Sequence, residues 1–178
     1  MTMRILLSGL LGAGCTEVAE TLAKQDEAKI VNSVEAIKDL ISERGESFQL
    51  FDMESRSGEF DLDVLLRNKA LEYIDDFDDL IIEGRLALLV LDHAFDLKAF
   101  LTATLDDRIA HVASRRKISK EQARKIVQHS DKEREHVVEK LFDYPLDLCR
   151  FDVVLNTSTY GFERAAQTLG EFLRKPKR

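Results

Sequence analysis

Near its start the sequence reads Gly9-Leu10-Leu11-Gly12-Ala13-Gly14-Cys15-Thr16, directly after the apolar run Arg4-Ile5-Leu6-Leu7 and before a segment with apolar residues at helical spacing. A glycine-rich turn between a buried strand and a helix lets successive backbone N–H groups face one anion at the helix N-terminus. Three of the chain's eight glycines fall within six residues of this stretch. The stretch therefore predicts a phosphate-binding loop formed by Gly9, Gly12, Ala13, Gly14, Cys15 and Thr16.

The loop departs from the pattern G-x-x-x-x-G-K-[S/T] at one position, where Cys15 stands in place of lysine. Lysine supplies a positive charge to the phosphates, whereas cysteine is shorter and its thiol is mostly neutral at pH 7. Loss of one preorganised transition-state donor typically costs about 10²–10³ in rate. Thr16 keeps the hydroxyl that normally ligates Mg²⁺. We interpret Cys15 as a small replacement residue, with a redox-sensitive thiol as the alternative.

Apolar runs and amphipathic helical segments alternate along the rest of the chain, without a linker or an internal repeat. Strands are expected at residues 4–7, 29–31, 79–83, 97–101 and 151–155. This alternation predicts a single α/β domain, residues 1–178, with helices on both faces of a central, mostly parallel sheet. The segment 128–136 lies in a helical region but has no apolar residue, so it cannot bury a face in the core.

Composition and charge argue against several classes of protein. The net charge is −7, from 33 acidic and 26 basic side chains, so a general nucleic-acid binder is not expected. No window of about 18 uncharged apolar residues exists to predict a membrane span. The apolar segment Met1–Leu11 is short and is followed by Glu17 and Glu20, which argues against a secretory signal. With only Cys15 and Cys149, we expect free thiols and a cytoplasmic location.

Further segments add to the loop. Glu83-Gly84-Arg85-Leu86-Ala87 closes the strand expected at 79–83, and Glu59–Asp63 is followed one turn later by Arg67. With these motifs the chain resembles the short archaeal-type cytidylate kinases, a family of P-loop nucleoside monophosphate kinases whose E-G-R-L-A motif the first segment matches. The resemblance extends to residues 31–40, 96–103 and 153–158. It implies a three-layer P-loop nucleoside triphosphate hydrolase fold with a monophosphate-binding insertion at 33–75 and a lid at 117–142.

The resemblance also implies roles for individual side chains. The phosphate of an acceptor nucleoside monophosphate would be held by Lys38, Arg67 and Arg85. Lys38 stands where the family usually carries arginine, so it keeps the charge and loses the bidentate fork. Thr16 and Glu83 would lie at the Mg²⁺ that accompanies ATP.

A lid that covers the phosphates usually carries several arginines in this family. The resemblance implies that the charge on the transferred group is stabilised by Arg108, Arg115 and Arg134. His129 and His136 stand where two further arginines are usual, and neutral histidine cannot clamp a phosphate. We expect both histidines to be exposed and paired with Asp131 or Glu133.

Two functions are compatible with these residues. The first is transfer of the γ-phosphoryl group of ATP, with Mg²⁺, to a pyrimidine nucleoside monophosphate such as CMP. The second is a non-catalytic kinase-like protein that binds a nucleotide or a protein partner, which the cysteine in the loop and the two histidines favour. Two further features are interpreted as structural: Phe48 and Phe51 as core residues, and Asp61 and Asp63 as a solvated turn.

Overall fold

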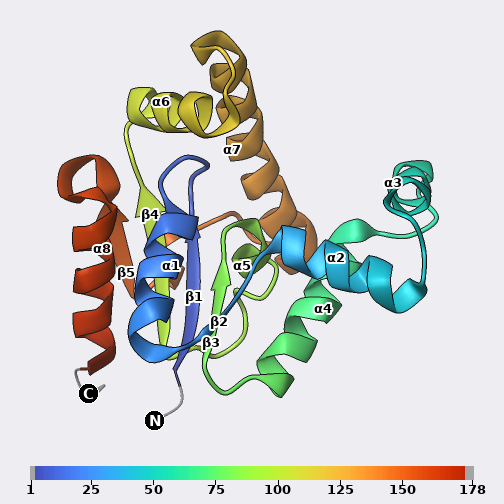
Figure 1. Ribbon diagram of the computed structural model, residues 1–178, viewed down its shortest axis with the longest axis horizontal. Coiled ribbons are helices and arrows are strands. Elements are labelled where there is room, and N and C mark those ends of the chain that lie inside the picture. The colour runs from blue at the N-terminus through green and yellow to red at the C-terminus, as the bar shows by residue number, and fades with distance from the viewer. Residues whose placement is uncertain (1–2, 175–178) are drawn as a thin grey trace.

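The computed structural model describes residues 3–174, with only the backbone of residues 25 and 26, and shows one parallel five-stranded sheet (Figure 1). The strand order is β2-β3-β1-β4-β5. The strands are β1 (Arg4–Gly9), β2 (Lys29–Val31), β3 (Leu80–Glu83), β4 (Leu97–Thr102) and β5 (Val153–Asn156). In the central strand, Leu7 is in register with Glu83 of β3 and with Ala99 of β4. The predicted alternation and the parallel sheet are confirmed.

Helices cover both faces of the sheet. They are α1 (Cys15–Asp26), α2 (Ser33–Arg44), α3 (Phe48–Ser57), α4 (Leu62–Asp76), α5 (Arg85–Leu88), α6 (Leu105–Arg116), α7 (Lys120–Phe142) and α8 (Thr157–Arg174), with a short 3-10 turn at Leu148–Arg150. Ile5 and Leu7 pack in one cluster with residues of α1 and α8, while Leu6 packs in another with residues of α4, α5 and α7. Burial on both faces explains why β1 is an unbroken apolar run. Among the described residues, no helix has the length and apolar character needed to cross a membrane.

Helices α2 and α3 project from the side of the sheet (Figure 1). Helix α2 is capped at its start by Asn32, whose side chain accepts hydrogen bonds from the next turn, and at its end by Gly45, with φ +65°. The apolar pattern does not predict α3. Its residue Phe51 is buried against Phe60, with ring centroids 5.1 Å apart, whereas Phe48 is 62% exposed. The core interpretation is therefore right for Phe51 and wrong for Phe48.

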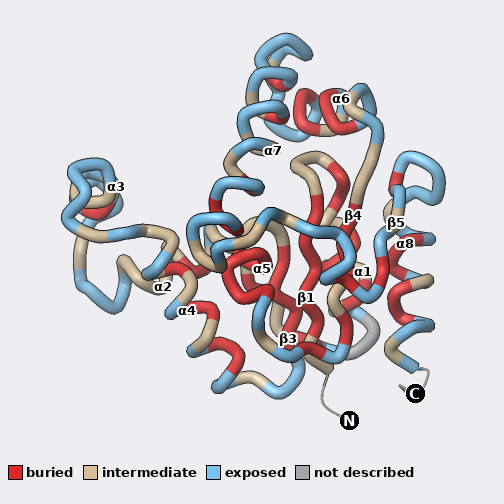
Figure 2. The backbone as a smooth tube through the Cα atoms, turned by 180° about the vertical axis from the view of Figure 1, so that it is seen from behind, coloured by how far each residue is buried: buried red, intermediate tan, exposed pale blue. Residues whose placement is uncertain are grey.

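Helices α6 and α7 pack on each other around a small apolar cluster of their own. The cluster consists of Ile109, Val112, Ala113, Ala123 and Val127. The C-terminal part of α7 joins the main core through Val137 and Val138. Between these two regions, α7 is exposed over most of its surface (Figure 2), and Arg134 is the one buried residue of the segment 128–136. This agrees with the apolar gap in the sequence.

Candidate functional site

The glycine-rich loop joins the C-terminal end of the central strand β1 to the start of α1. The backbone N–H of Ala13 donates to the carbonyl of Leu10 at 2.9 Å and closes a turn. Gly12 and Gly14 have φ of +89° and +91°, which glycine adopts at little cost. Helix α1 then starts without a side-chain cap, so the N–H groups of its first turn are available to bind an anion.

Neighbouring elements press closely on this loop. A Cβ atom added to Gly14 would lie 2.3 Å from the ring of Phe162, and one added to Gly12 would lie 2.7 Å from the carbonyl oxygen of Arg108. The hydroxyl of Thr157 donates to the carbonyl of Ala13 at 2.9 Å. The glycines are thus required by packing against α6 and α8 as well as by backbone conformation.

Cys15 occupies the lysine position of the motif at the first residue of α1. Burial, with Glu83 nearby, raises the pKa of its thiol to about 12. The thiolate is the reactive form of cysteine, so this environment argues against a redox-sensitive role. The side chain brings neither positive nor negative charge to the loop at neutral pH.

Alkylation tests this assignment. At pH 7.5, iodoacetamide is expected to modify Cys149, which is exposed, and to leave Cys15 of the folded protein unmodified, because Cys15 is less accessible and its pKa of about 12 keeps the thiol protonated. Mass spectrometry of proteolytic peptides measures both sites. In urea, the two cysteines should react at similar rates. Equal labelling of Cys15 and Cys149 in the folded protein would contradict the assignment.

An oxygen-rich group lies beside the loop at the C-terminal edge of the sheet. The buried carboxylate of Glu83 accepts hydrogen bonds from the Thr16 hydroxyl at 3.1 Å and from the Asn32 side-chain amide at 3.0 Å. Burial raises the pKa of Glu83, while these two hydrogen bonds oppose the shift. Asn32 is a further residue of the site that the motifs do not indicate, although its position directly after β2 places it at this edge.

The donor atoms of this group suit Mg²⁺, which prefers oxygen ligands and usually keeps water and substrate phosphates in its shell. Thr16 and Glu83 offer two such oxygens. The described residues include no cluster of three or more metal-binding side chains that could enclose a metal alone. The site therefore fits a cation shared with a phosphorylated ligand.

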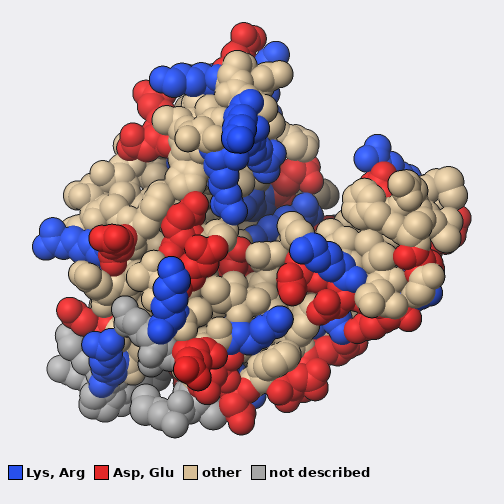
Figure 3. Space-filling view, in the orientation of Figure 1, with Lys and Arg blue, Asp and Glu red and all other residues tan. Residues whose placement is uncertain are grey.

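A cleft of about 310 Å³ opens above the loop, lined by the glycines, Thr16, Glu83 and side chains of α6 and α7. Arg115 lies at its rim, with Nη1 3.5 Å from the Thr16 hydroxyl and 3.7 Å from a Glu17 carboxylate oxygen. His111 contacts the same carboxylate at 3.0 Å. Lysine and arginine side chains gather below α6 and α7 on this side of the molecule, above acidic side chains near the start of α1 (Figure 3).

The other two predicted lid arginines are buried and differ in their partners. Arg108 donates to both carboxylate oxygens of Asp131 at 2.8–3.1 Å. Arg134 lines the cleft, and its Nε donates to the carbonyl of Gly9 at 2.9 Å. His129 and His136 are exposed as expected. The expected pairing of the histidines with Asp131 is wrong, because the carboxylate of Asp131 binds Arg108 instead.

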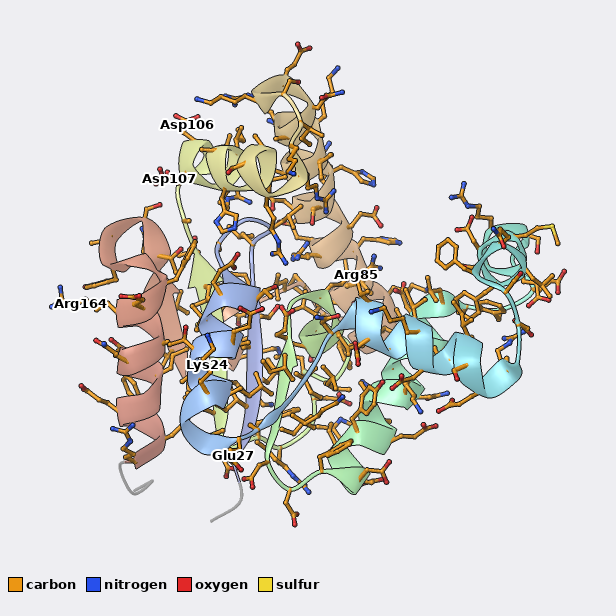
Figure 4. The ribbon with its side chains drawn as sticks, viewed as in Figure 1. Lys24, Glu27, Arg85, Asp106, Asp107 and Arg164 are labelled. Atoms are coloured by element: carbon orange, nitrogen blue, oxygen red, sulfur yellow. The ribbon has the colours of Figure 1, made fainter. Side chains whose placement is uncertain are left out.

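Of the three side chains predicted to bind the acceptor phosphate, Arg85 and Arg67 form ion pairs with aspartates, and Lys38 is exposed. Arg85 donates to Asp63 at 2.7 Å, and it lies next to the C-terminal part of α7 (Figure 4). Arg67 forms a two-pronged pair with Asp92 at 2.7 and 2.9 Å and also donates to the carbonyl of Leu89. Lys38 is exposed on α2.

The interpretation of Asp61 and Asp63 as a solvated turn is right for the exposed Asp61 and wrong for Asp63. Asp61 caps α4 and pairs with Lys140 of α7 at 2.6 Å. Asp63 is mostly buried and lies between Arg85 and Lys140, at 2.7 and 3.5 Å. The acidic turn therefore joins the start of α4 to α5 and α7.

Comparisons with known proteins agree with this geometry. The sequence profile described as "Cytidylate kinase-like family" matches residues 4–159. A cytidylate kinase of Methanopyrus kandleri is 31% identical over 167 residues, 88% of this chain and 86% of its own length. A cytidylate kinase of Sulfolobus acidocaldarius is 31% identical over 159 residues, with coverage of 88% and 86%.

Solved structures share the fold at low sequence identity. A shikimate kinase from Bacteroides thetaiotaomicron aligns with a TM-score of 0.66 and 15% identity, over 98% of this chain and 100% of its own. An uncharacterised protein from Eubacterium ventriosum aligns with a TM-score of 0.72 and 18% identity, over 97% and 98%. These similarities show that the same α/β fold extends over almost the whole chain.

Proposed function

Because the chain belongs to the cytidylate kinase-like family, we propose that it transfers the γ-phosphoryl group of ATP to a nucleoside monophosphate, with CMP as the acceptor. One observation carries the proposal. A single cleft brings together the uncapped glycine loop, the oxygen pair of Thr16 and Glu83, and the cations Arg115 and Arg134. Catalysis of phosphoryl transfer is mostly positioning and electrostatic stabilisation, and these groups supply both.

On the donor side, the backbone N–H groups of the loop and of the first turn of α1 would bind the phosphates of ATP. Thr16 and Glu83 would hold Mg²⁺, which neutralises charge on the phosphates when it is bound. Asn32 orients Glu83 through its side-chain amide, and Arg115 would reach the transferred group from α6.

On the acceptor side, Arg85 would bind the phosphate of the monophosphate, with Arg67 and Lys38 nearby in the proposed monophosphate-binding insertion at residues 33–75. Arg85 is held by the carboxylate of Asp63, which resembles a phosphate oxygen in charge. An incoming phosphate must therefore compete with Asp63 for the guanidinium. The segment 117–142 would cover the bound phosphates.

This competition leads to a testable expectation. Asp63→Asn should tighten CMP binding about two- to fivefold, because a partly exposed ion pair of this kind contributes about 0.5–1 kcal/mol. Isothermal titration calorimetry with CMP measures the change. Asp106→Asn removes an exposed carboxylate of α6 that pairs with Arg124 of α7, and it should leave the affinity unchanged. Unchanged or weaker CMP binding by Asp63→Asn would show that the carboxylate does not compete with the ligand.

A non-catalytic nucleotide-binding or partner-binding role is the second candidate. The neutral thiol at Cys15 and the engagement of Arg67 and Arg85 with carboxylates favour it. The neutral thiol and the two ion pairs both leave less positive charge available to a bound phosphate.

Two measurements distinguish the candidates. Calorimetry with ATP–Mg²⁺ and with CMP, separately, tests binding, and a coupled assay with CMP, dCMP, UMP and AMP tests transfer and base preference. Binding of both ligands together with turnover of CMP supports the kinase. Binding without turnover supports the non-catalytic protein. Binding of neither ligand overturns both nucleotide-based functions.

A further inference from the structure

Two side chains from distant parts of the chain meet at Gly9, the first residue of the loop. The Cys15 sulfur lies close enough that a Cβ atom on Gly9 would be 2.9 Å from it. Arg134 of α7 donates a hydrogen bond from its Nε to the carbonyl of the same glycine at 2.9 Å. Since Sγ takes the place of the first atom beyond Cβ, a lysine at position 15 in this rotamer would also start toward Gly9.

The surroundings of Arg134 differ from those of an arginine in a structural ion pair. Its side chain is buried, and its hydrogen bonds go to neutral oxygens of Gly9 and Ser130. Arg108 on the facing helix, in contrast, gives its guanidinium to both oxygens of Asp131. A buried charge is costly unless an opposite charge compensates it. Because Arg134 lines the cleft, an anion bound there would provide that compensation.

We propose that Arg134 supplies from α7 the positive charge that the loop lacks at Cys15, so that its guanidinium contacts the phosphates of ATP in place of a loop lysine. The inference rests on the proposed function, since it assigns a group to the same phosphate site. Arginine suits this role because its planar fork can donate two parallel hydrogen bonds to phosphate. The short side chain of Cys15 leaves space for the guanidinium beside Gly9.

This arrangement makes an unusual prediction for the lysine of the motif. A lysine introduced at position 15 would approach Gly9, where Arg134 already lies, and two cations would compete for one place. Cys15→Lys alone is therefore expected to change the affinity for ATP–Mg²⁺ by less than about threefold. Arg134→Gln is expected to weaken this affinity at least about tenfold and to lower kcat/KM for CMP by about 10²–10³. The double variant, Cys15→Lys with Arg134→Gln, should bind ATP–Mg²⁺ at least about tenfold more tightly than Arg134→Gln alone.

Calorimetry with ATP–Mg²⁺ and the coupled assay with CMP measure all three variants. Arg124→Gln is the matched control, because Arg124 is a more exposed arginine on the same helix, and it should behave as the wild type. Circular dichroism and thermal unfolding check that each variant is folded. If Arg134→Gln does not fold, Cys15→Lys and Cys15→Ala in the presence of Arg134 decide the question. If Cys15→Lys binds ATP–Mg²⁺ at least tenfold more tightly than Cys15→Ala, the proposal is overturned. Equal affinities of the two variants support it.

The same data separate this proposal from the proposed function. Turnover of CMP that is insensitive to Arg134→Gln overturns the role of Arg134 and leaves the kinase function standing. Binding of ATP–Mg²⁺ that requires Arg134, without transfer to CMP, supports the role of Arg134 and overturns the kinase function. A gain from Cys15→Lys that is the same with arginine or glutamine at position 134 also overturns the role of Arg134. A wild-type protein that binds no ATP–Mg²⁺ overturns both.

Discussion

Glu83→Gln is expected to lower kcat for phosphorylation of CMP by about 10²–10³ and, at the same time, to raise the thermal stability of the ligand-free protein. Glutamine keeps an oxygen that accepts from Thr16 and Asn32, so the local geometry is retained. It removes the charge that would bind Mg²⁺ beside the phosphates. It also removes the cost of burying an ionised carboxylate.

The stabilising effect of Glu83→Gln is expected to depend on pH. Because burial raises the pKa of Glu83 from its usual value of 4.5, the folded protein binds this proton more tightly than the unfolded chain does. The contribution of Glu83 to the free energy of unfolding therefore falls as pH rises from 4.5 through the raised pKa. The stability gain from Glu83→Gln should be larger at pH 8 than at pH 4.5.

Thermal unfolding at the two pH values and the coupled assay at pH 8 measure these effects. Glu121→Gln, which removes an exposed carboxylate from α7, should change neither stability nor turnover. A Glu83→Gln variant that loses stability at pH 8, or keeps full turnover, would contradict the assignment.

Gly14→Ala is expected to reduce the affinity for ATP–Mg²⁺ more than about 100-fold and to destabilise the protein by about 2–4 kcal/mol. Two costs add at this position. An alanine at φ +91° is strained, and its Cβ would lie 2.3 Å from the ring of Phe162. Relief of this clash requires a shift of the loop or of α8, and either shift displaces the N–H groups that face the phosphate.

Gly58→Ala separates the two costs, because Gly58 has φ +80° and no atom within 4 Å of an added Cβ. It should destabilise the protein by about 1 kcal/mol and leave ATP–Mg²⁺ binding intact. Adding Phe162→Ala to Gly14→Ala should restore part of the lost affinity. Calorimetry measures the affinity for ATP–Mg²⁺, and urea unfolding measures the free energy of unfolding. Equal effects of Gly14→Ala and Gly58→Ala on binding would exclude the clash as the cause.

The sheet and most helices could be predicted because each strand is a short apolar run and most of the helices have an apolar stripe. Helix α7 is an exception, since its segment 128–136 has no apolar residue. Burial of Ile5, Leu6 and Leu7 on both faces of the sheet is the physical origin of that signal. Helix α3 gave no comparable signal, since it projects from the sheet and buries Phe51 but not Phe48. A helix that buries so few of its residues lacks the periodic pattern on which the prediction depends.

The loop could be placed from its glycines, but the partners of the predicted arginines could not. Arg67, Arg85 and Arg108 each bind an aspartate 22 to 25 residues away, and such pairings depend on tertiary packing. Asp63 looked like part of a surface turn because adjacent acidic residues are usually solvated. Its burial follows from the position of α4 beside α5 and α7, which the local sequence does not encode.

The separate apolar cluster of α6 and α7 has a consequence for how phosphate affinity is controlled. That cluster shares no residue with the core of the sheet, whereas the C-terminal part of α7 is anchored in this core through Val137 and Val138. A tilt of α6 and the first part of α7 about this anchor would therefore leave the core of the sheet packed. A tilt would break the bond from Arg134 to Gly9, while Arg108 and Asp131 would move together. If Arg134 supplies the positive charge of the loop, as we propose, the loop would bind phosphate most tightly in only one position of the helix pair. Donor affinity and helix position are then thermodynamically linked, and each changes the other by the same free energy.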